Sequence, residues 1–173
     1  MKGFSPAGPP QGETQMIPNT PPVDIRPLQA AHLPEVHRML IDLARHHGDV
    51  ATITPPALRA LVLDAPDLRG LVAFPGDRPS RLPVGYALLS RRTDLITGRS
   101  GYDITHLFVQ DVFRGKGIGR ALIAAARRLA QDEGCKRLTI GTPPTNAAAA
   151  AAYRAMGLVE RPLPGPSFAV PLA

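Results

Sequence analysis

The sequence lacks the features that mark a secreted or membrane-spanning protein. Cys135 is its only cysteine, so no intramolecular disulfide can form and a reducing compartment is the default. No run approaches the roughly 20 apolar residues of a membrane span, and the first residues lack the apolar stretch of a secretion signal. We therefore expect a soluble, cytoplasmic protein with no membrane partner.

Aromatic residues are also scarce, at 5% of the chain with no tryptophan, although the net charge is +6. The positive charge is concentrated, because Asp111–Arg137 holds seven of the basic residues and only three of the acidic ones. Proteins that bind nucleic acid usually combine a basic stripe with stacking aromatics. The composition therefore favours a local anionic ligand and argues against a nucleic-acid partner.

Proline is missing from one part of the chain only. The sequence holds 20 prolines, yet none lies in Val84–Thr142. Proline is excluded from central strands and helix interiors, so this window is where unbroken elements are expected. Residues 1–22 are rich in proline and glycine without an apolar period, and we expect them to form a tail before one domain over 23–173.

Hydrophobic periodicity predicts strands and helices in the order β-α-α-β-β-β-α-β-α-β-β. This order is typical of an α/β fold in which helices flank a mixed sheet. The expected strands are Val23–Arg26, Leu71–Phe74, Val84–Leu89, Tyr102–Gln110, Arg137–Ile140, Val159 and Phe168–Val170. The expected helices begin near Leu33, Pro55, Ile118 and Thr145. The last of these is expected from helix propensity alone.

The turn between Gln110 and Ala121 carries the clearest chemical signal. It follows an apolar strand, holds glycine at 115, 117 and 119, and opens directly into a helix. Glycines let a ligand approach the backbone, and the first N–H groups of a helix bind phosphate oxygens. Because Arg114, Lys116 and Arg120 add positive charge, the turn predicts a pyrophosphate site.

Two other phosphate-binding loops do not fit this turn. The dinucleotide fingerprint requires a glycine where Arg120 stands. The P-loop requires a hydroxyl residue after its lysine, but Gly117 follows Lys116. A purely structural role for the glycines, shaping a tight strand-to-helix turn, remains an alternative.

These residues resemble the GNAT family of N-acetyltransferases. Arg114–Gly119 is similar to the family's acetyl-CoA signature, in which arginine or glutamine precedes two spaced glycines, and Asn146, Tyr153 and Gly157 are similar to a second motif. The resemblance implies a single GNAT-like domain with a mostly antiparallel sheet and acetyl-CoA as donor. A looser likeness to the diamine and thialysine branch departs at Thr105–His106 and at Ala152.

The resemblance also implies roles for single residues. The backbone of Leu107–Val109 would pair with the pantetheine arm, and Tyr153 would protonate the leaving thiolate. The implied cofactor-binding residues are Leu107, Phe108, Val109, Arg114, Gly115, Lys116, Gly117, Ile118, Gly119, Arg120, Asn146 and Tyr153. From the residues alone, Asn146 also suits a helix N-cap and Tyr153 an ordinary core position.

The general base is not fixed by any motif. Strict alternation along Tyr102–Gln110 puts Asp103 on the face of Thr105, Leu107 and Val109, with His106 on the opposite face. Thr105 cannot accept a proton at neutral pH, so Asp103 and His106 are the candidate bases, with His46 or His47 as substitutes. No metal site is expected, because the histidines show no ligand spacing.

We expect an acetyl-CoA-dependent N-acetyltransferase that acts directly on a primary amine of a small molecule. A protein N-terminus or lysine is the alternative acceptor. An acyl-CoA sensor without activity and a basic nucleic-acid-binding module are the alternatives outside catalysis. Members of this family are often dimeric, so the resemblance implies a homodimer.

Overall fold

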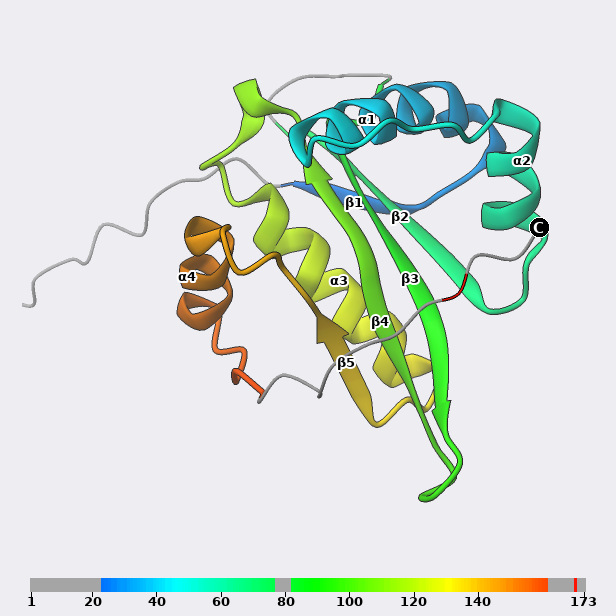
Figure 1. Cartoon of the computed structure of the whole chain (residues 1–173), viewed down its shortest axis with the longest axis vertical. Helices are drawn as coiled ribbons and strands as arrows, with labels where there is room; N and C mark the ends of the chain where they lie inside the picture. Colours follow the sequence, from blue (N-terminus) through cyan, green and yellow to red (C-terminus); the bar gives the residue numbers. More distant parts are fainter. Residues whose placement is uncertain (1–22, 77–81, 162–169, 171–173) are drawn as a thin grey trace, which may run out of the picture.

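A five-stranded sheet forms the centre of the computed structural model, which describes residues 23–76, 82–161 and 170. The strands lie in sequence order, and neighbours are antiparallel except β4 and β5, which run parallel (Figure 1). Their bounds are Asp24–Pro27 for β1, Leu68–Phe74 for β2, Gly85–Asp94 for β3, Arg99–Val109 for β4 and Arg137–Ile140 for β5. The mixed, mostly antiparallel sheet predicted from the sequence is confirmed.

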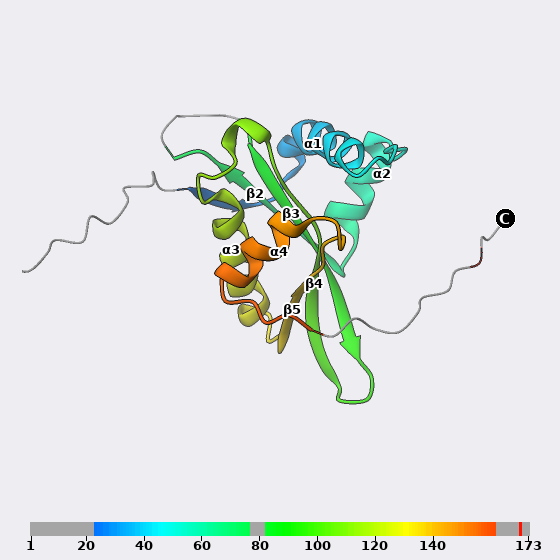
Figure 2. The same ribbon diagram turned by 60° about the vertical axis from the view of Figure 1, so that its left-hand side comes forward.

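In the described residues, four α-helices cover the two faces of this sheet. Helices α1 (Leu33–His46) and α2 (Pro55–Arg59) lie over one face, while α3 (Ile118–Asp132) and α4 (Ala147–Ala155) lie over the other (Figure 2). Each predicted helix is present, and α2 continues into one π-helical turn. No helix in the described part of the chain is long and apolar enough to cross a membrane.

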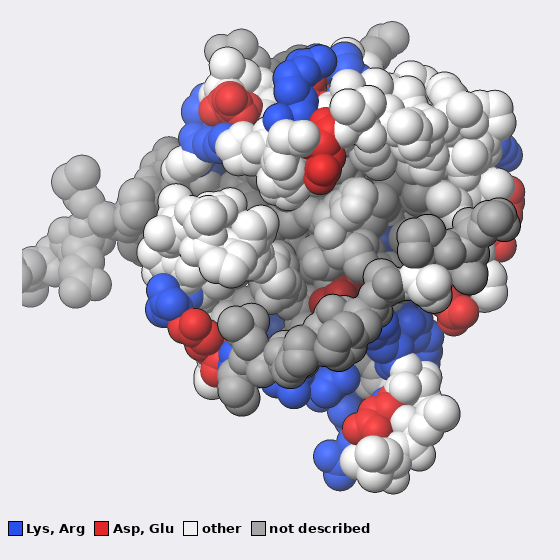
Figure 3. All heavy atoms as spheres, viewed as in Figure 1, with Lys and Arg blue, Asp and Glu red and all other residues white. Residues whose placement is uncertain are grey.

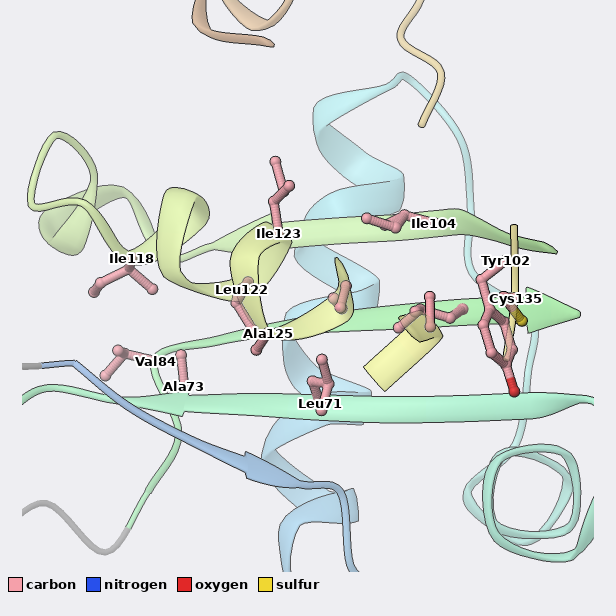
Figure 4. Packing of buried hydrophobic residues seen from close by; sticks show 14 residues of the cluster. Leu71, Ala73, Val84, Tyr102, Ile104, Ile118, Leu122, Ile123, Ala125 and Cys135 are labelled. Atoms are coloured by element: carbon pink, nitrogen blue, oxygen red, sulfur yellow. The ribbon is translucent and has the colours of Figure 1, made fainter. Parts of the chain in front are cut away.

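Two apolar clusters hold the helices to the sheet, because alternate residues of each strand face opposite ways. In β3, Ala87 and Leu89 pack toward α3, whereas Tyr86 and Leu88 pack toward α1. Figure 4 shows the α3 side, where Leu122 lies against the sheet beside Leu71. The sheet is therefore buried on both faces.

A β-bulge in β4 overturns the predicted alternation of that strand. Leu88 pairs with His106 but Leu89 pairs with Ile104, so Thr105 has no opposite partner and the pleat shifts by one residue. As a result, β4 turns Tyr102, Ile104, Leu107 and Val109 toward α3 and Asp103, His106 and Phe108 toward α1. The expectation that Asp103 and His106 lie on opposite faces is wrong.

The predicted strands at the C-terminal end are only partly within the described residues. Val159 forms no strand and is exposed, so the prediction of a strand there is wrong. Val170 is likewise outside any strand of the described chain. Phe168 and Ala169 lie outside the described residues.

Glu133 ties the far end of the sheet to α3. Its carboxylate accepts hydrogen bonds from Arg69 Nε at 2.8 Å, Arg91 Nη1 at 3.1 Å and the Tyr102 hydroxyl at 2.6 Å. Burial opposes ionisation of Glu133, but the hydrogen bonds from Tyr102 and Arg69 and the two positive charges outweigh it and lower its pKa. One side chain therefore links β2, β3, β4 and α3.

We expect Glu133→Gln to lower the free energy of unfolding by about 1–3 kcal/mol at pH 7, because it removes a charged acceptor shared by three donors. Because the pKa of Glu133 is lower in the folded state than in the unfolded state, its carboxylate stabilises the fold at pH values above the unfolded pKa. The difference in stability between the variant and the parent protein therefore shrinks as the pH falls through the folded pKa. Chemical denaturation at several pH values measures it. Asp132→Asn, at an exposed neighbouring position, is the control; equal stability of both variants contradicts the prediction.

Candidate active site

The loop between β4 and α3 has the geometry of an anion cradle. Gly115 and Gly117 adopt φ of 74° and 78°, a left-handed conformation that other residues rarely take. Gly117 is the N-cap of α3, so the first N–H groups of that helix are directed into the loop. A side-chain carbon added at Gly115 or Gly119 would meet nothing within 4 Å, so the space beside them is open.

Cations flank this loop on its outer side. Arg114 donates from Nε to the Val109 carbonyl at 3.1 Å and pairs with Asp111 at 2.8 Å. The Lys116 ammonium lies 5.2 Å from the centre of the Phe113 ring. Together with the open glycines and the helix dipole, these charges fit a pyrophosphate. Ile118, by contrast, is buried in the core and offers the loop only its backbone.

Within the described part of the chain, no strand pairs with the edge of β4 beside this loop. β5 pairs only with Gly101–Ile104, whereas β4 runs on to Val109 (Figure 1). Gln110 donates its N–H to the Val84 carbonyl. Because the backbone N–H and C=O groups of successive strand residues point to opposite sides, those of Phe108 face β3, and those of Leu107 and Val109 face the open edge. The Val109 carbonyl accepts a hydrogen bond from Arg114 rather than from β3, which agrees with this orientation. An extended ligand could pair with this edge as a strand would.

Helix α4 holds Tyr153 and is capped by Asn146, two of the sequence-predicted residues. Asn146 is the N-cap of α4, since its Oδ1 accepts from the Ala149 N–H at 3.0 Å. The N-cap reading is therefore confirmed, and its contact with a cofactor stays a prediction. Tyr153 is half-buried against the α3-side cluster, and burial raises its pKa, so the phenol keeps its proton at neutral pH.

The two candidate bases differ in how their polar atoms are occupied. Asp103 accepts from the Thr139 hydroxyl at 2.7 Å and lies 3.9 Å from Arg92 Nε. His106 is largely buried beside Tyr86, with ring centres 6.5 Å apart, and its Nδ1 has no hydrogen-bond partner among the described residues. Burial, and then the charge of His47, lower the pKa of His106. His106 is therefore neutral and able to accept a proton at pH 7.

A pocket of about 450 Å³ opens between α1 and the end of β4. Phe108 and His46 lie in its wall. His106 is on the same face of β4 as Phe108, but it is not one of the described residues that line the pocket. The lining residues are Arg38, Asp42, Arg45, His46, Phe108, Gln110, Asp111, Val112 and Arg114.

The charged lining from α1 was not singled out in the sequence. The signal was available, because Glu35, Arg38, Asp42 and Arg45 follow one another at three- and four-residue spacing and share one helical face. The spacing does not show that this face of α1 lies opposite the end of β4. Glu35 joins the two elements, because its carboxylate accepts a hydrogen bond from Gln110 Nε2 at 2.8 Å.

Two relatives of known activity cover most of the chain. Aminoglycoside N(6')-acetyltransferase type 1 of Salmonella typhimurium is 28% identical over 141 residues, or 80% of this chain and 92% of that protein. Thialysine N-epsilon-acetyltransferase of Bos taurus is 30% identical over 142 residues, or 78% of this chain and 83% of that protein.

Solved structures share the fold. The complex of AAC(6')-Iy with the bisubstrate analogue CoA-S-monomethyl-acetylneamine has a TM-score of 0.69 at 24% identity, covering 85% of this chain and 99% of that one. A ribosomal-protein-alanine N-acetyltransferase from Brucella melitensis has a TM-score of 0.67 at 19% identity, covering 87% of this chain and all of that one. At these identities the likeness concerns the fold alone.

The family itself is shown by the sequence. Residues 35–158 match the Acetyltransferase (GNAT) family, a span that includes the glycine loop, the open edge of β4 and α4. The chain therefore belongs to the GNAT family and is an N-acetyltransferase that takes its acetyl group from acetyl-CoA.

Proposed function

We propose that the enzyme transfers the acetyl group directly to a primary amine of a small molecule. The observation that carries this proposal is the pocket of about 450 Å³ beside the open edge of β4, a volume typical of small-molecule sites. The names of the two relatives, an aminoglycoside and a thialysine acetyltransferase, support a small acceptor. The homodimer and the cytoplasmic location expected from the sequence stay predictions.

In this proposal the glycine loop and the edge of β4 hold the donor. Acetyl-CoA supplies the acetyl group as an activated thioester. The N–H groups at the start of α3 and the side chains of Arg114, Lys116 and Arg120 bind its pyrophosphate. Leu107 and Val109 pair with the pantetheine arm, and the Val109 N–H donates to the oxyanion that forms during transfer.

Two side chains move the protons. His106 accepts the proton of the acceptor ammonium at Nε2, because its imidazole is neutral at pH 7 and its Nδ1 is buried where an acceptor does not reach it. Asp103 is less suited, since both of its oxygens lie beside donors from Thr139 and Arg92. Tyr153 donates its phenolic proton to the departing thiolate.

We expect Gly117→Glu to weaken acetyl-CoA binding at least tenfold, because the carboxylate enters the anion cradle and Gly117 has a left-handed φ. Isothermal titration calorimetry measures the binding. Gly98→Glu is the matched control, since Gly98 also has a positive φ but lies at the exposed hairpin tip. Equal affinity of both variants would show that the loop does not hold the cofactor.

We expect Tyr153→Phe to lower kcat by about 10²-fold, the usual contribution of a general acid, with little change in acetyl-CoA affinity. The hydroxyl is removed while the ring stays packed against the core. Steady-state assays of CoA release on small amines and on a peptide N-terminus measure the effect. An unchanged kcat excludes Tyr153 as the acid, and transfer to the peptide alone refutes the small-molecule acceptor.

We expect kcat to fall at acid pH as His106 takes up a proton. Because burial lowers the pKa of His106 below the ordinary value of about 6.5, this limb lies below pH 6.5. His106→Gln should remove the limb and lower kcat at pH 7 by about 10²-fold. Asp103→Asn and His46→Gln are the comparison variants. If one of them removes the limb while His106→Gln keeps it, that residue is the base.

A further inference from the structure

The acceptor pocket is lined by more guanidinium groups than carboxylates. Arg38, Asp42 and Arg45 reach it from one face of α1, and Asp111 and Arg114 reach it from the segment after β4. Figure 3 shows the basic and acidic side chains intermixed over the upper part of the molecule, where these two elements lie. Three guanidinium groups and two carboxylates thus face a space of about 450 Å³.

Each of these carboxylates already has a guanidinium partner. Asp42 accepts from Arg45 Nη1 at 3.2 Å and lies 4.0 Å from Arg38 Nη1, so two cations share it. Asp111 pairs with Arg114 at 2.8 Å, and its side chain is 80% exposed. A second ammonium group on the acceptor would have to displace an arginine from one of them. The lining is therefore a poor match for a polycation.

Arg45, in contrast, keeps donors to spare. It makes one hydrogen bond to the described residues, to Asp42, although a guanidinium carries five N–H donors. Its side chain is 76% exposed and lines the open pocket, whereas Arg38 is held by Glu35, which accepts from Arg38 Nε at 3.1 Å and also from Nη2. Planar guanidinium groups bind carboxylates through paired hydrogen bonds. The pocket thus offers an anion site at the end that α1 forms.

We propose that the acceptor is an amine that also carries a carboxylate, as amino acids do, and that Arg45 binds this carboxylate. The inference rests on the proposed function, since it names the acceptor class of the same site. The bound carboxylate anchors the acceptor at α1 and leaves its amine free to reach the edge of β4. The alternative ligand for this guanidinium is a phosphate of acetyl-CoA, and the experiment below distinguishes the acceptor carboxylate from the cofactor.

Matched acceptor pairs that differ only by the carboxylate test the proposal. The pairs are lysine with cadaverine, ornithine with putrescine, and phenylalanine with phenethylamine, assayed on the full chain at saturating acetyl-CoA. We expect the carboxylate to raise kcat/KM at least tenfold in the pair that is turned over, with the ratio shrinking at high salt. Arg45→Gln should remove most of that ratio without changing the KM for acetyl-CoA.

Arg59→Gln is the control, because Arg59 is exposed on α2 away from the pocket and should leave the ratio unchanged. Equal or better use of cadaverine, putrescine or phenethylamine overturns the acceptor class but leaves the small-molecule function intact. A raised KM for acetyl-CoA in Arg45→Gln with an unchanged ratio assigns the arginine to the cofactor and also overturns the inference. If acetyl-CoA binds and no member of any pair is acetylated, the small-molecule function fails together with it.

Discussion

The parting of β5 from β4 is the constraint on which the site depends. β5 stays paired only with Gly101–Ile104, and beyond that point no strand of the described residues pairs with this edge of β4. An unpaired edge is normally a liability, since it invites another strand. Here the edge runs from the bulge at Thr105 to the glycine loop, so one exposed backbone connects the anion cradle to the pocket. The fold thus holds open the place where a cofactor can act as the missing strand.

Contacts at the paired end of the sheet offset the backbone pairing that is lost at the open end. Where β4 and β5 are still paired, Glu133 joins three strands to α3 through Arg69, Arg91 and Tyr102. On either side of the sheet an apolar cluster buries α1 or α3 against it. The strands are therefore fixed at one end, and the loss of pairing at the other does not spread along the sheet.

Much of this could be predicted from the sequence, because local signals suffice for it. Apolar spacing located the five strands and helices α1 to α3, the helix propensity of the alanine run located α4, and the glycines of residues 115–119 marked the cradle. The bulge at Thr105 could not be predicted, since strict alternation fits the residues of β4 equally well and only the pairing with Leu88 and Leu89 reveals the extra residue. The charged pocket was missed for a similar reason: Arg38 and Arg45 look like an ordinary solvated helix face until β4 is placed opposite.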